Sequence, residues 1–384
     1  MPTSGETTPP PALGNDGADG SRRASRDGDA LEVVLVADPG QPASRAHQIA
    51  RDTEEELRGI LGRDVLISVE TDLLRLRPDD TLETGTPERL SRRRARAAIA
   101  VMVTEMPRLR GARPIIAEAY AQHGIAVISC PTLGVLTPHR RLRAAVRACI
   151  LQLLGATDRR TPPREAWQDD EDGGAQLLLA SPVIGPARLL TGMVSSNEPL
   201  RTAPRLSSAL AAASATGAFG IFYNSIWLMA DALSTMRLAG IALLAISLMV
   251  LWLMLSNRLW DRPIHQGLRR VVAMYNLSTI ITLFVVVSLL YMTLFVMILM
   301  GGLVVIDPGF MSSLLDEEAQ FTNYLDIAWL AASMGVVAGA LGASFDSSTD
   351  LRKITHGQRE RQRPHVDDED DDPPESEDVH RGPS

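Results

Sequence analysis

LAGIALLAISLMVLWLML, at residues 238–255, is the first of two apolar runs that decide the fold of this chain. The second is VVAMYNLSTIITLFVVVSLLYMTLFVMILMGGLVVI, at residues 271–306. Neither run contains Asp, Glu, Lys, Arg or His. Each reaches the roughly 18 apolar residues that a helix needs to cross a bilayer. The sequence therefore predicts a membrane protein, with the lipid bilayer as its first partner.

A short segment rich in arginine, residues 257–270, joins the two runs. It carries one acid, Asp261, and four arginines: Arg258, Arg262, Arg269 and Arg270. Short connections rich in arginine and lysine stay in the cytoplasm, because charges close to the ends of a span resist translocation. We therefore expect this hinge to lie in the cytoplasm.

Four membrane helices follow from this orientation, at about residues 206–230, 237–256, 271–302 and 325–345. The first is the weakest, because Ser, Thr and Asn dilute its hydrophobicity. If the hinge and the preceding domain are both cytoplasmic, this segment must cross so that the next one can return. The lysine and arginines that follow the fourth helix favour a cytoplasmic C-terminus.

The second run, which forms the third expected helix, is too long for one upright span. Its 36 residues would extend about 54 Å as a helix, against a hydrocarbon core of about 30 Å. We expect one tilted helix whose end packs against protein or projects past the bilayer. Two crossings are the alternative, although no Gly, Pro or charge interrupts the run before residues 301 and 302.

Residues 31–155 have the pattern of an α/β domain. Four runs rich in β-forming residues alternate with amphipathic stretches: LEVVLVA, VLISVE, AAIAVMV and IAVISC. Such alternation is typical of a parallel sheet covered by helices. The fold class predicted is therefore an open, mostly parallel sheet of about four strands in a cytosolic domain, followed by an all-α transmembrane bundle of four helices.

The remaining segments are polar. Residues 1–30 lack large apolar side chains and are expected to form a disordered tail, as are residues 346–384, which are first basic and then acidic. Residues 156–205 are expected to form a linker, with an amphipathic segment at the membrane surface as an alternative. Residues 31–155 carry 18 arginines against 15 acids, so the domain is not basic enough to indicate a nucleic-acid partner.

Three loops at the predicted carboxyl ends of strands are candidates for a ligand site, because ligands of open α/β sheets bind there. Together they offer an acid, cations and backbone amides to a small anionic ligand. Ordinary turn chemistry is the alternative, since Pro and Gly are frequent in any loop. The candidate ligand-binding residues are Asp38, Gly40, Thr104, Glu105, Arg108, Arg110, Cys130 and Thr132.

Polar and small residues mark candidate contacts between the membrane helices. Asn224 and Asn276 need hydrogen-bond partners inside a membrane, and a bond between helices is expected. Gly335 and Gly339 form a GxxxG pattern that lets two helices approach closely. These faces pack either within the bundle or between the copies of a homo-oligomer.

No motif indicates a reaction. The sequence has no GxGxxG, Walker loop or HExxH, and its only cysteines are Cys130 and Cys149. We therefore predict no catalytic residue, no metal site and no cofactor. The function expected is that the α/β domain binds a cytosolic protein partner or a small anionic ligand. A membrane-tethered enzyme with its site at the carboxyl ends of the strands, and a passive transporter or channel, are the alternatives.

Five segments resemble uncharacterised membrane proteins of actinobacteria: VADPG (36–40), AVMVTEMPRLRGARPIIAEAY (100–120), VISCPTLGVL (127–136), YNLSTIITL (275–283) and VIDPG (305–309). The likeness covers roughly residues 31–363. It implies a cytosolic α/β domain before a helical bundle and carries over no activity. It also implies a multi-pass protein of the plasma (inner) membrane of a bacterium, with both termini in the cytoplasm.

Overall fold

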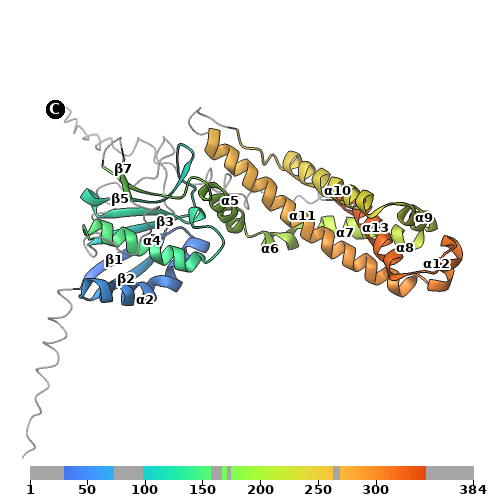
Figure 1. The fold of residues 1–384 in the computed structure, drawn as a ribbon, viewed down its shortest axis with the longest axis horizontal. Coiled ribbons are helices and arrows are strands. Elements are labelled where there is room, and N and C mark those ends of the chain that lie inside the picture. The colour runs from blue at the N-terminus through green and yellow to red at the C-terminus, as the bar shows by residue number, and fades with distance from the viewer. Residues whose placement is uncertain (1–29, 73–97, 157–166, 171–173, 263–268, 343–384) are drawn as a thin grey trace, which may run out of the picture.

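The protein is described by a computed structural model, which covers residues 30–72, 98–156, 167–170, 174–262 and 269–342. The expected tails, residues 1–30 and 346–384, lie almost entirely outside the described residues. The chain forms an N-terminal α/β domain and a mostly helical C-terminal region (Figure 1).

The α/β domain is built on a mixed sheet of eight strands in the order β2-β1-β3-β6-β5-β8-β7, with β4 paired to β5. The strands β2, β1, β3 and β6 are parallel, and every other pairing is antiparallel. Their bounds are β1 Leu31–Ala37, β2 Val65–Thr71, β3 Ile99–Thr104, β4 Leu109–Arg110, β5 Arg113–Tyr120, β6 Ile125–Ser129, β7 Trp167–Asp169 and β8 Gln176–Leu179.

A mostly parallel sheet of about four strands is therefore not confirmed. The four predicted strands correspond to β1, β2, β3 and β6, but the sheet continues through antiparallel strands. Residues 156–205 are expected to form a linker, whereas the described part of this range supplies β7, β8, α5 and α6. The polar composition around β7 and β8 hid these strands, which are only three and four residues long.

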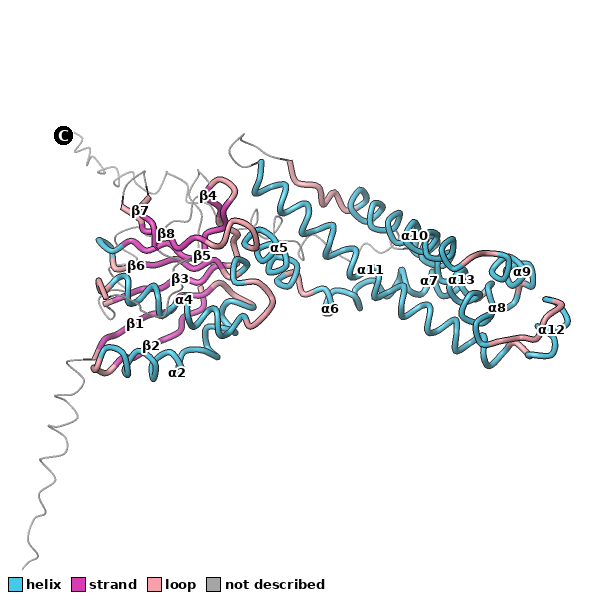
Figure 2. The backbone as a smooth tube through the Cα atoms, viewed as in Figure 1, coloured by secondary structure: helices cyan, strands magenta, loops and turns pink. Residues whose placement is uncertain are grey.

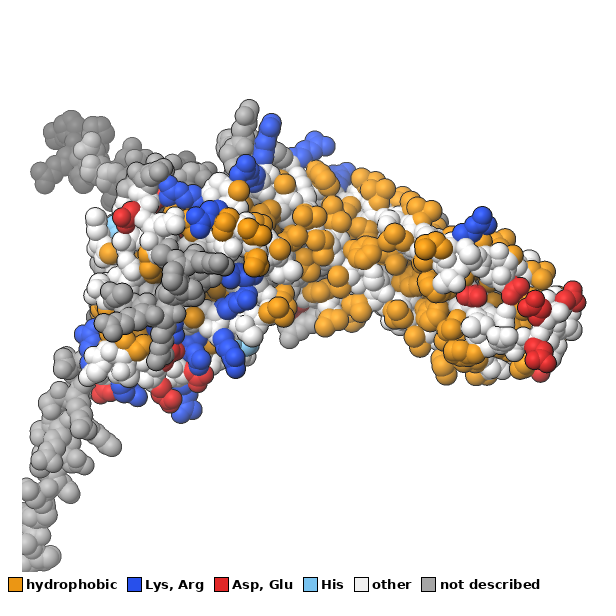
Figure 3. All heavy atoms as spheres, viewed as in Figure 1, with side chains coloured by type: hydrophobic (Ala, Val, Ile, Leu, Met, Phe, Trp, Pro, Cys, Tyr) orange, Lys and Arg blue, Asp and Glu red, His pale blue; other side chains and the backbone are white. Residues whose placement is uncertain are grey.

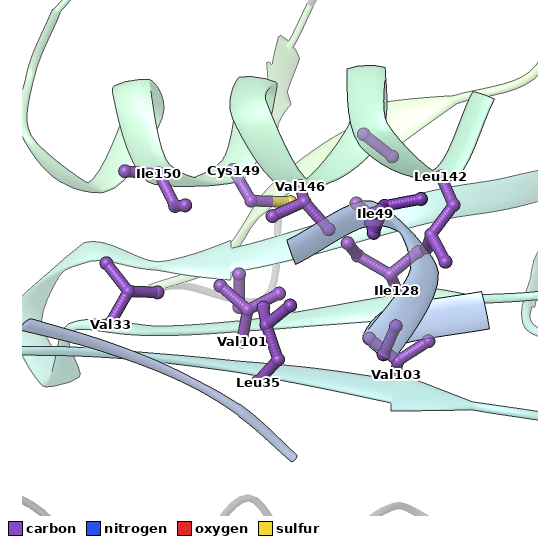
Figure 4. Close-up of a cluster of buried hydrophobic side chains, with 14 of the residues drawn as sticks. Val33, Leu35, Ile49, Val101, Val103, Ile128, Leu142, Val146, Cys149 and Ile150 are labelled. Atoms are coloured by element: carbon purple, nitrogen blue, oxygen red, sulfur yellow. The ribbon is translucent and has the colours of Figure 1, made fainter. Parts of the chain in front are cut away.

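Two helices, α2 (Gln41–Leu61) and α4 (Pro138–Leu153), cover one face of the sheet. Figure 4 shows Leu35, Val101 and Ile128 of the sheet beneath Val146 of α4. On the opposite face Val34, Val36 and Met102 form a second buried cluster. Burial on both faces explains why β3, and β1 after the exposed Glu32, read as apolar runs rather than as alternating ones.

The C-terminal region is almost entirely helical, as the tube in Figure 2 shows. Its helices are α5 Gly185–Ser196, α6 Pro199–Thr202, α7 Ser207–Gly217, α8 Phe219–Phe222, α9 Asn224–Ala232, α10 Thr235–Ser256, α11 Arg269–Val305, α12 Pro308–Leu315 and α13 Phe321–Gly342. Within the described residues, α10 and α11 are the two helices that are long and apolar enough to cross a membrane.

The expected helix at residues 206–230 is not continuous. It is divided into α7, α8 and α9, with Tyr223 in an extended conformation before α9. Trp227 Nε1 donates a hydrogen bond of 2.9 Å to the carbonyl oxygen of Gly220, so a carbonyl near the break has a partner. Glycine favours such a break, because it is a weak helix former.

The helix α11 is continuous over 37 residues, so its run does not turn back on itself. Its first turns pack against α5, where Tyr275 joins Leu189 and Met193 in a buried cluster. Asn197, just after α5, donates to Thr282 Oγ1 over 2.9 Å. The extra length of this run is therefore an end that packs against protein, which was one of the two expected explanations.

The small residues of α13 meet those of α7 within the same chain. A Cβ atom at Gly335 would lie 2.6 Å from the carbonyl oxygen of Ala213, and one at Gly339 would lie 2.8 Å from that of Ala209. Of the two expected arrangements, the structure therefore has these two glycines packed within the chain. A homo-oligomer stays a prediction.

Asn276 has a different partner from the expected one. Its Oδ1 accepts from the backbone N–H of Asp261, and its Nδ2 donates to the carbonyl oxygen of Asp261, both over 2.9 Å. The bond thus joins α11 to the hinge rather than to another long helix. Asn224 begins α9 and is half-buried.

Candidate functional site

The carboxyl ends of the parallel strands face the helical region. The strands β1, β3 and β6 are parallel neighbours, so their carboxyl ends share one edge of the sheet. The 3-10 helix η2 (Pro131–Leu133) follows β6 at this edge and packs against α5. Figure 1 shows this edge turned toward α5 and α11. The place where α/β sheets bind ligands therefore lies next to the long helices.

Two of the predicted ligand residues, Asp38 and Thr104, are brought together but are fully buried. Asp38 Oδ2 accepts from Thr104 Oγ1 over 2.7 Å and from the backbone N–H of Glu105 over 3.0 Å. Thr104 Oγ1 in turn accepts from the N–H of Met106 over 3.2 Å. These bonds join the loop after β1 to the loop after β3, so they explain the two side chains as parts of the loop structure.

Thr132 and Cys130 lie in the third loop and are buried as well. Thr132 Oγ1 donates to Ser129 Oγ over 3.1 Å, and Ser129 Oγ donates to the carbonyl oxygen of Met106 over 2.7 Å. Burial raises the pKa of Cys130 to about 12, although the nearby Arg45 acts in the opposite direction. The thiol is therefore protonated at neutral pH and is a poor nucleophile.

The predicted cations, Arg108 and Arg110, are paired with Glu118 of β5 and with Asp170, which follows β7. Arg108 Nε lies 2.9 Å from Glu118 Oε1, and Arg110 forms an ion pair with Asp170. Tyr120 donates to Glu118 Oε2 over 3.0 Å. The pKa of Tyr120 is raised to about 12, mainly by burial and to a smaller extent by the negative charge of Glu118. Both arginines thus have acidic partners already, which weakens the case for an anionic ligand.

A pocket of about 580 Å³ lies beside this edge, where the α/β domain meets α5 and α11. Most of its lining is apolar. It is lined by Gln41, Val135, Leu190, Thr191, Val194, Ser195, Glu198, Pro199, Leu200 and Ile281. Its volume falls within the roughly 300–1,000 Å³ of pockets that hold small molecules.

Three of the four polar residues that line the pocket are joined by hydrogen bonds, and the fourth, Thr191, bonds to the carbonyl oxygen of Arg188. Gln41 Nε2 donates to the carbonyl oxygen of Ser195 over 3.0 Å and to Glu198 Oε1 over 3.3 Å. Gln41 follows Gly40, whose φ of +97° suits glycine and turns the chain into α2. Glu198 has a φ of +47°, an uncommon conformation for a residue with a side chain.

The helix α5 is fitted closely to the edge of the sheet. A Cβ atom at Gly192 would lie 2.0 Å from the carbonyl oxygen of Pro131, so only glycine allows this approach. Arg188 Nε donates to the carbonyl oxygen of Thr132 over 2.8 Å. One side of α5 therefore rests on η2, another contacts α11, and Leu190 and Val194 face the pocket.

None of the residues predicted to bind a ligand lines the pocket, although Gln41 of the lining directly follows the predicted residue Gly40. The one sequence signal for this part of the pocket is the amphipathic stretch after residue 185, which the pattern predicts as a segment at the membrane surface if it is not a linker. In the described part of the chain, no group of three or more His, Cys, Asp or Glu side chains is placed to hold a metal ion.

Known proteins give no further guide to the site. A comparison of the chain with protein families, with curated proteins and with solved structures found no match.

Proposed function

We propose that this chain is a multi-pass membrane protein whose cytosolic α/β domain binds a small, largely apolar ligand in the pocket between the sheet edge and α11. The observation that carries the proposal is the position of this pocket. It lies beside the edge at which α/β sheets bind ligands, and its far wall is a helix apolar enough to cross a membrane. Ligand binding and the membrane helices would then share one structural element.

A broad apolar surface supports the membrane placement. Fewer than half of the residues in the apolar stretches of α10 and α11 are buried inside the protein, whereas the core helix of a soluble protein is mostly buried. Figure 3 shows hydrophobic side chains covering the middle of the helical region. Monomeric soluble proteins rarely expose a continuous apolar surface of this extent.

Four spans are proposed, and the lengths of α10 and α13 agree with this number. The segment α7 to α9, together with α10, the outer part of α11 and α13, would cross in turn. Both α10 and α13 have 22 residues, about 33 Å of helix at roughly 1.5 Å per residue, which matches a hydrocarbon core of about 30 Å. With its first turns on α5, α11 retains about two dozen residues for its own crossing.

The charges at the two ends support the orientation. Arginines of the hinge lie beside the α/β domain, and the opposite tip carries mostly acids (Figure 3). The hinge arginines Arg258 and Arg262 are exposed, whereas Asp307, Asp316 and Glu318 lie around α12. Cationic segments stay in the cytoplasm, so the α/β domain and the hinge are on that side.

A non-enzymatic role agrees best with the side chains at the edge. Asp38 and Thr104 bond to each other and to nearby backbone, Cys130 is buried, and Arg108 and Arg110 have acidic partners. These contacts also favour the apolar pocket over the anionic ligand that the loops suggested.

Reporter fusions test the placement. A reporter that is active only in the cytoplasm, fused after residue 262 and at the C-terminus, is expected to be active, while one fused at Asp316 is expected to be inactive. A reporter that is active only outside gives the reverse pattern. An active cytoplasmic reporter at Asp316 would contradict the orientation.

A fluorescent probe tests binding in the pocket. Thr191 is exposed on the pocket wall, whereas Cys130 and Cys149 are buried, so Thr191→Cys can be labelled with a small environment-sensitive dye in the full chain. Apolar ligands are expected to shift the emission of this dye. The control is Ser234→Cys, an exposed position before α10, which should not respond. Equal responses at both positions would contradict binding in the pocket.

A further inference from the structure

Resting on the proposed function, we infer a specific class of ligand: the pocket holds the hydrocarbon tail of a membrane lipid, which enters sideways from the cytoplasmic leaflet. Three features carry this inference. They are the level of the pocket along α11, the separation of its polar and apolar walls, and the exposed apolar residues at its rim.

The level of the pocket is set by polar contacts along α11. Asn276 is bonded to Asp261 of the hinge, and Thr282 accepts from Asn197. Ile281, which lines the pocket, lies within this polar stretch, and the buried cluster of the helical region begins on α11 at Leu283. The pocket therefore lies where the cytosolic contacts of α11 end and its apolar surroundings begin. That is the depth of the lipid headgroups and the first carbons of their tails.

The walls of the pocket are amphipathic. Gln41, Ser195 and Glu198 are joined by hydrogen bonds and make one polar corner. The side chains of Val194 and Ile281, together with the other apolar residues of the lining, make up most of the remaining surface. A lipid matches this division, because it has one polar end and a long apolar tail. A small sugar phosphate or nucleotide would leave most of its polar atoms without partners against such walls.

The rim of the pocket is apolar and exposed. Leu200, at the start of α6, is 73 % exposed, and Val135 is 46 % exposed. Leu136, next to Val135, is 75 % exposed. Large apolar side chains at this level would contact the bilayer rather than water, so the opening of the pocket is continuous with the lipid-facing surface. A lipid tail can then reach the pocket without crossing the cytosol.

A photoreactive lipid tests this inference in the full chain. The probe is a phosphatidylcholine with a diazirine near the end of one acyl chain, included in nanodiscs of phosphatidylcholine and phosphatidylglycerol. After illumination, labelled peptides are mapped by mass spectrometry. Labels are expected on residues 190–195 of α5 and near Val135, in addition to the exposed faces of α10 and α11.

Two variants fill the pocket, and one serves as a matched control. Val194→Trp and Thr191→Trp are each expected to lower the labelling of α5 at least fivefold, and Thr191→Trp keeps the test valid if the more buried change fails to fold. The control Leu248→Trp, on the exposed face of α10, should leave the labelling of α5 unchanged.

The outcomes separate this inference from the proposed function. Labels confined to α10, α11 and α13 would overturn the lipid tail. If the dye at Thr191→Cys then still responds to a water-soluble apolar ligand, the proposed function stands with another ligand class. If the dye responds to no ligand and α5 is not labelled, both proposals are wrong.

Discussion

Asp38 and Thr104 hold together two loops of the sheet edge. The carboxylate of Asp38 accepts two hydrogen bonds, and both side chains are fully buried. Asp38→Ala leaves the hydroxyl of Thr104 and the N–H of Glu105 without their acceptor, which is expected to cost about 2–3 kcal/mol of folding free energy. Thr104→Val keeps the bond between Asp38 and Glu105 but removes both the donor to Asp38 and the acceptor of the Met106 N–H, so it is expected to cost a similar amount. Thermal unfolding of the full chain in detergent measures both, and equal stability of Asp38→Ala and wild type would contradict the role of Asp38.

The buried thiol of Cys130 makes stability depend on alkaline pH. Burial raises its pKa from 9.0 to about 12. Between these values the unfolded chain loses the thiol proton while the folded chain keeps it, so stability is full below pH 9 and is lost as the pH rises toward 12. Each pH unit in this window costs about 1.4 kcal/mol. The melting temperatures of the wild type and of Cys130→Ala are measured at pH 8.5 and at pH 10.5. The fall between the two pH values is expected to be smaller for Cys130→Ala than for the wild type.

Gly335 permits the close approach of α13 to α7. A Cβ atom there would lie 2.6 Å from the carbonyl oxygen of Ala213 and 2.9 Å from Leu294 Cδ2. Gly335→Ala is therefore expected to lower stability by about 1–3 kcal/mol, because the helices must separate. Gly240→Ala on α10 is the control, since nothing lies within 4 Å of a Cβ atom at that position. The melting temperatures of the two variants in the same detergent decide the matter. A Gly335→Ala variant as stable as Gly240→Ala would contradict the close contact.

At the scale of elements, the strands differ in how well they can be predicted from the sequence. The parallel strand β3 is buried along its whole length and reads as an apolar run. The strand β5 contains Pro114 and Glu118, and the buried acid is paired with Arg108 and accepts a hydrogen bond from Tyr120. An apolar stretch that contains a charged residue has a sequence pattern similar to that of an amphipathic helix when the partner of the charge is not known. Arg108 and Glu118 are ten positions apart, a spacing at which neither helix nor strand periodicity indicates a pair.

Asn276 of α11 is hydrogen-bonded to the described part of the hinge. Asn276 bonds to both the N–H and the carbonyl oxygen of Asp261, which is buried. Asn276→Ala removes both hydrogen bonds to the buried backbone of Asp261, at an expected cost of about 1–3 kcal/mol each. Hydrogen exchange of the peptide that contains Asp261 should become faster. Asn257→Ala, a half-buried position at the end of α10, is the control. Unchanged exchange at Asp261 in Asn276→Ala would show that the hinge is held by other contacts.

At the scale of the whole molecule, the candidate site depends on contacts that no local pattern encodes. The loop residues Asp38 and Thr104 were identified from their position after strands, and the structure does bring them together. The pocket, however, needs Gln41 of α2, Val194 of α5 and Ile281 of α11 to meet. These residues come from three segments that are far apart in the sequence. The close contact between Gly192 and Pro131 brings α5 to the edge of the sheet, and this contact cannot be predicted from a single sequence.

The orientation of the whole molecule should depend on the hinge arginines. Replacing Arg258, Arg262, Arg269 and Arg270 by glutamine removes the positive charge on which the proposed cytoplasmic placement of the hinge rests. The activity of an externally active reporter at Asp316 is expected to fall severalfold, because part of the chains insert without a fixed orientation. The matched control is Arg237→Gln at the start of α10, the end next to the acidic tip, and it should keep full reporter activity. Full activity in the fourfold variant as well would mean that the folded α/β domain alone fixes the orientation. The packing of Tyr275 against Leu189 and Met193 would then be the contact to disrupt, since it joins α11 to α5, which packs against η2 at the edge of the sheet.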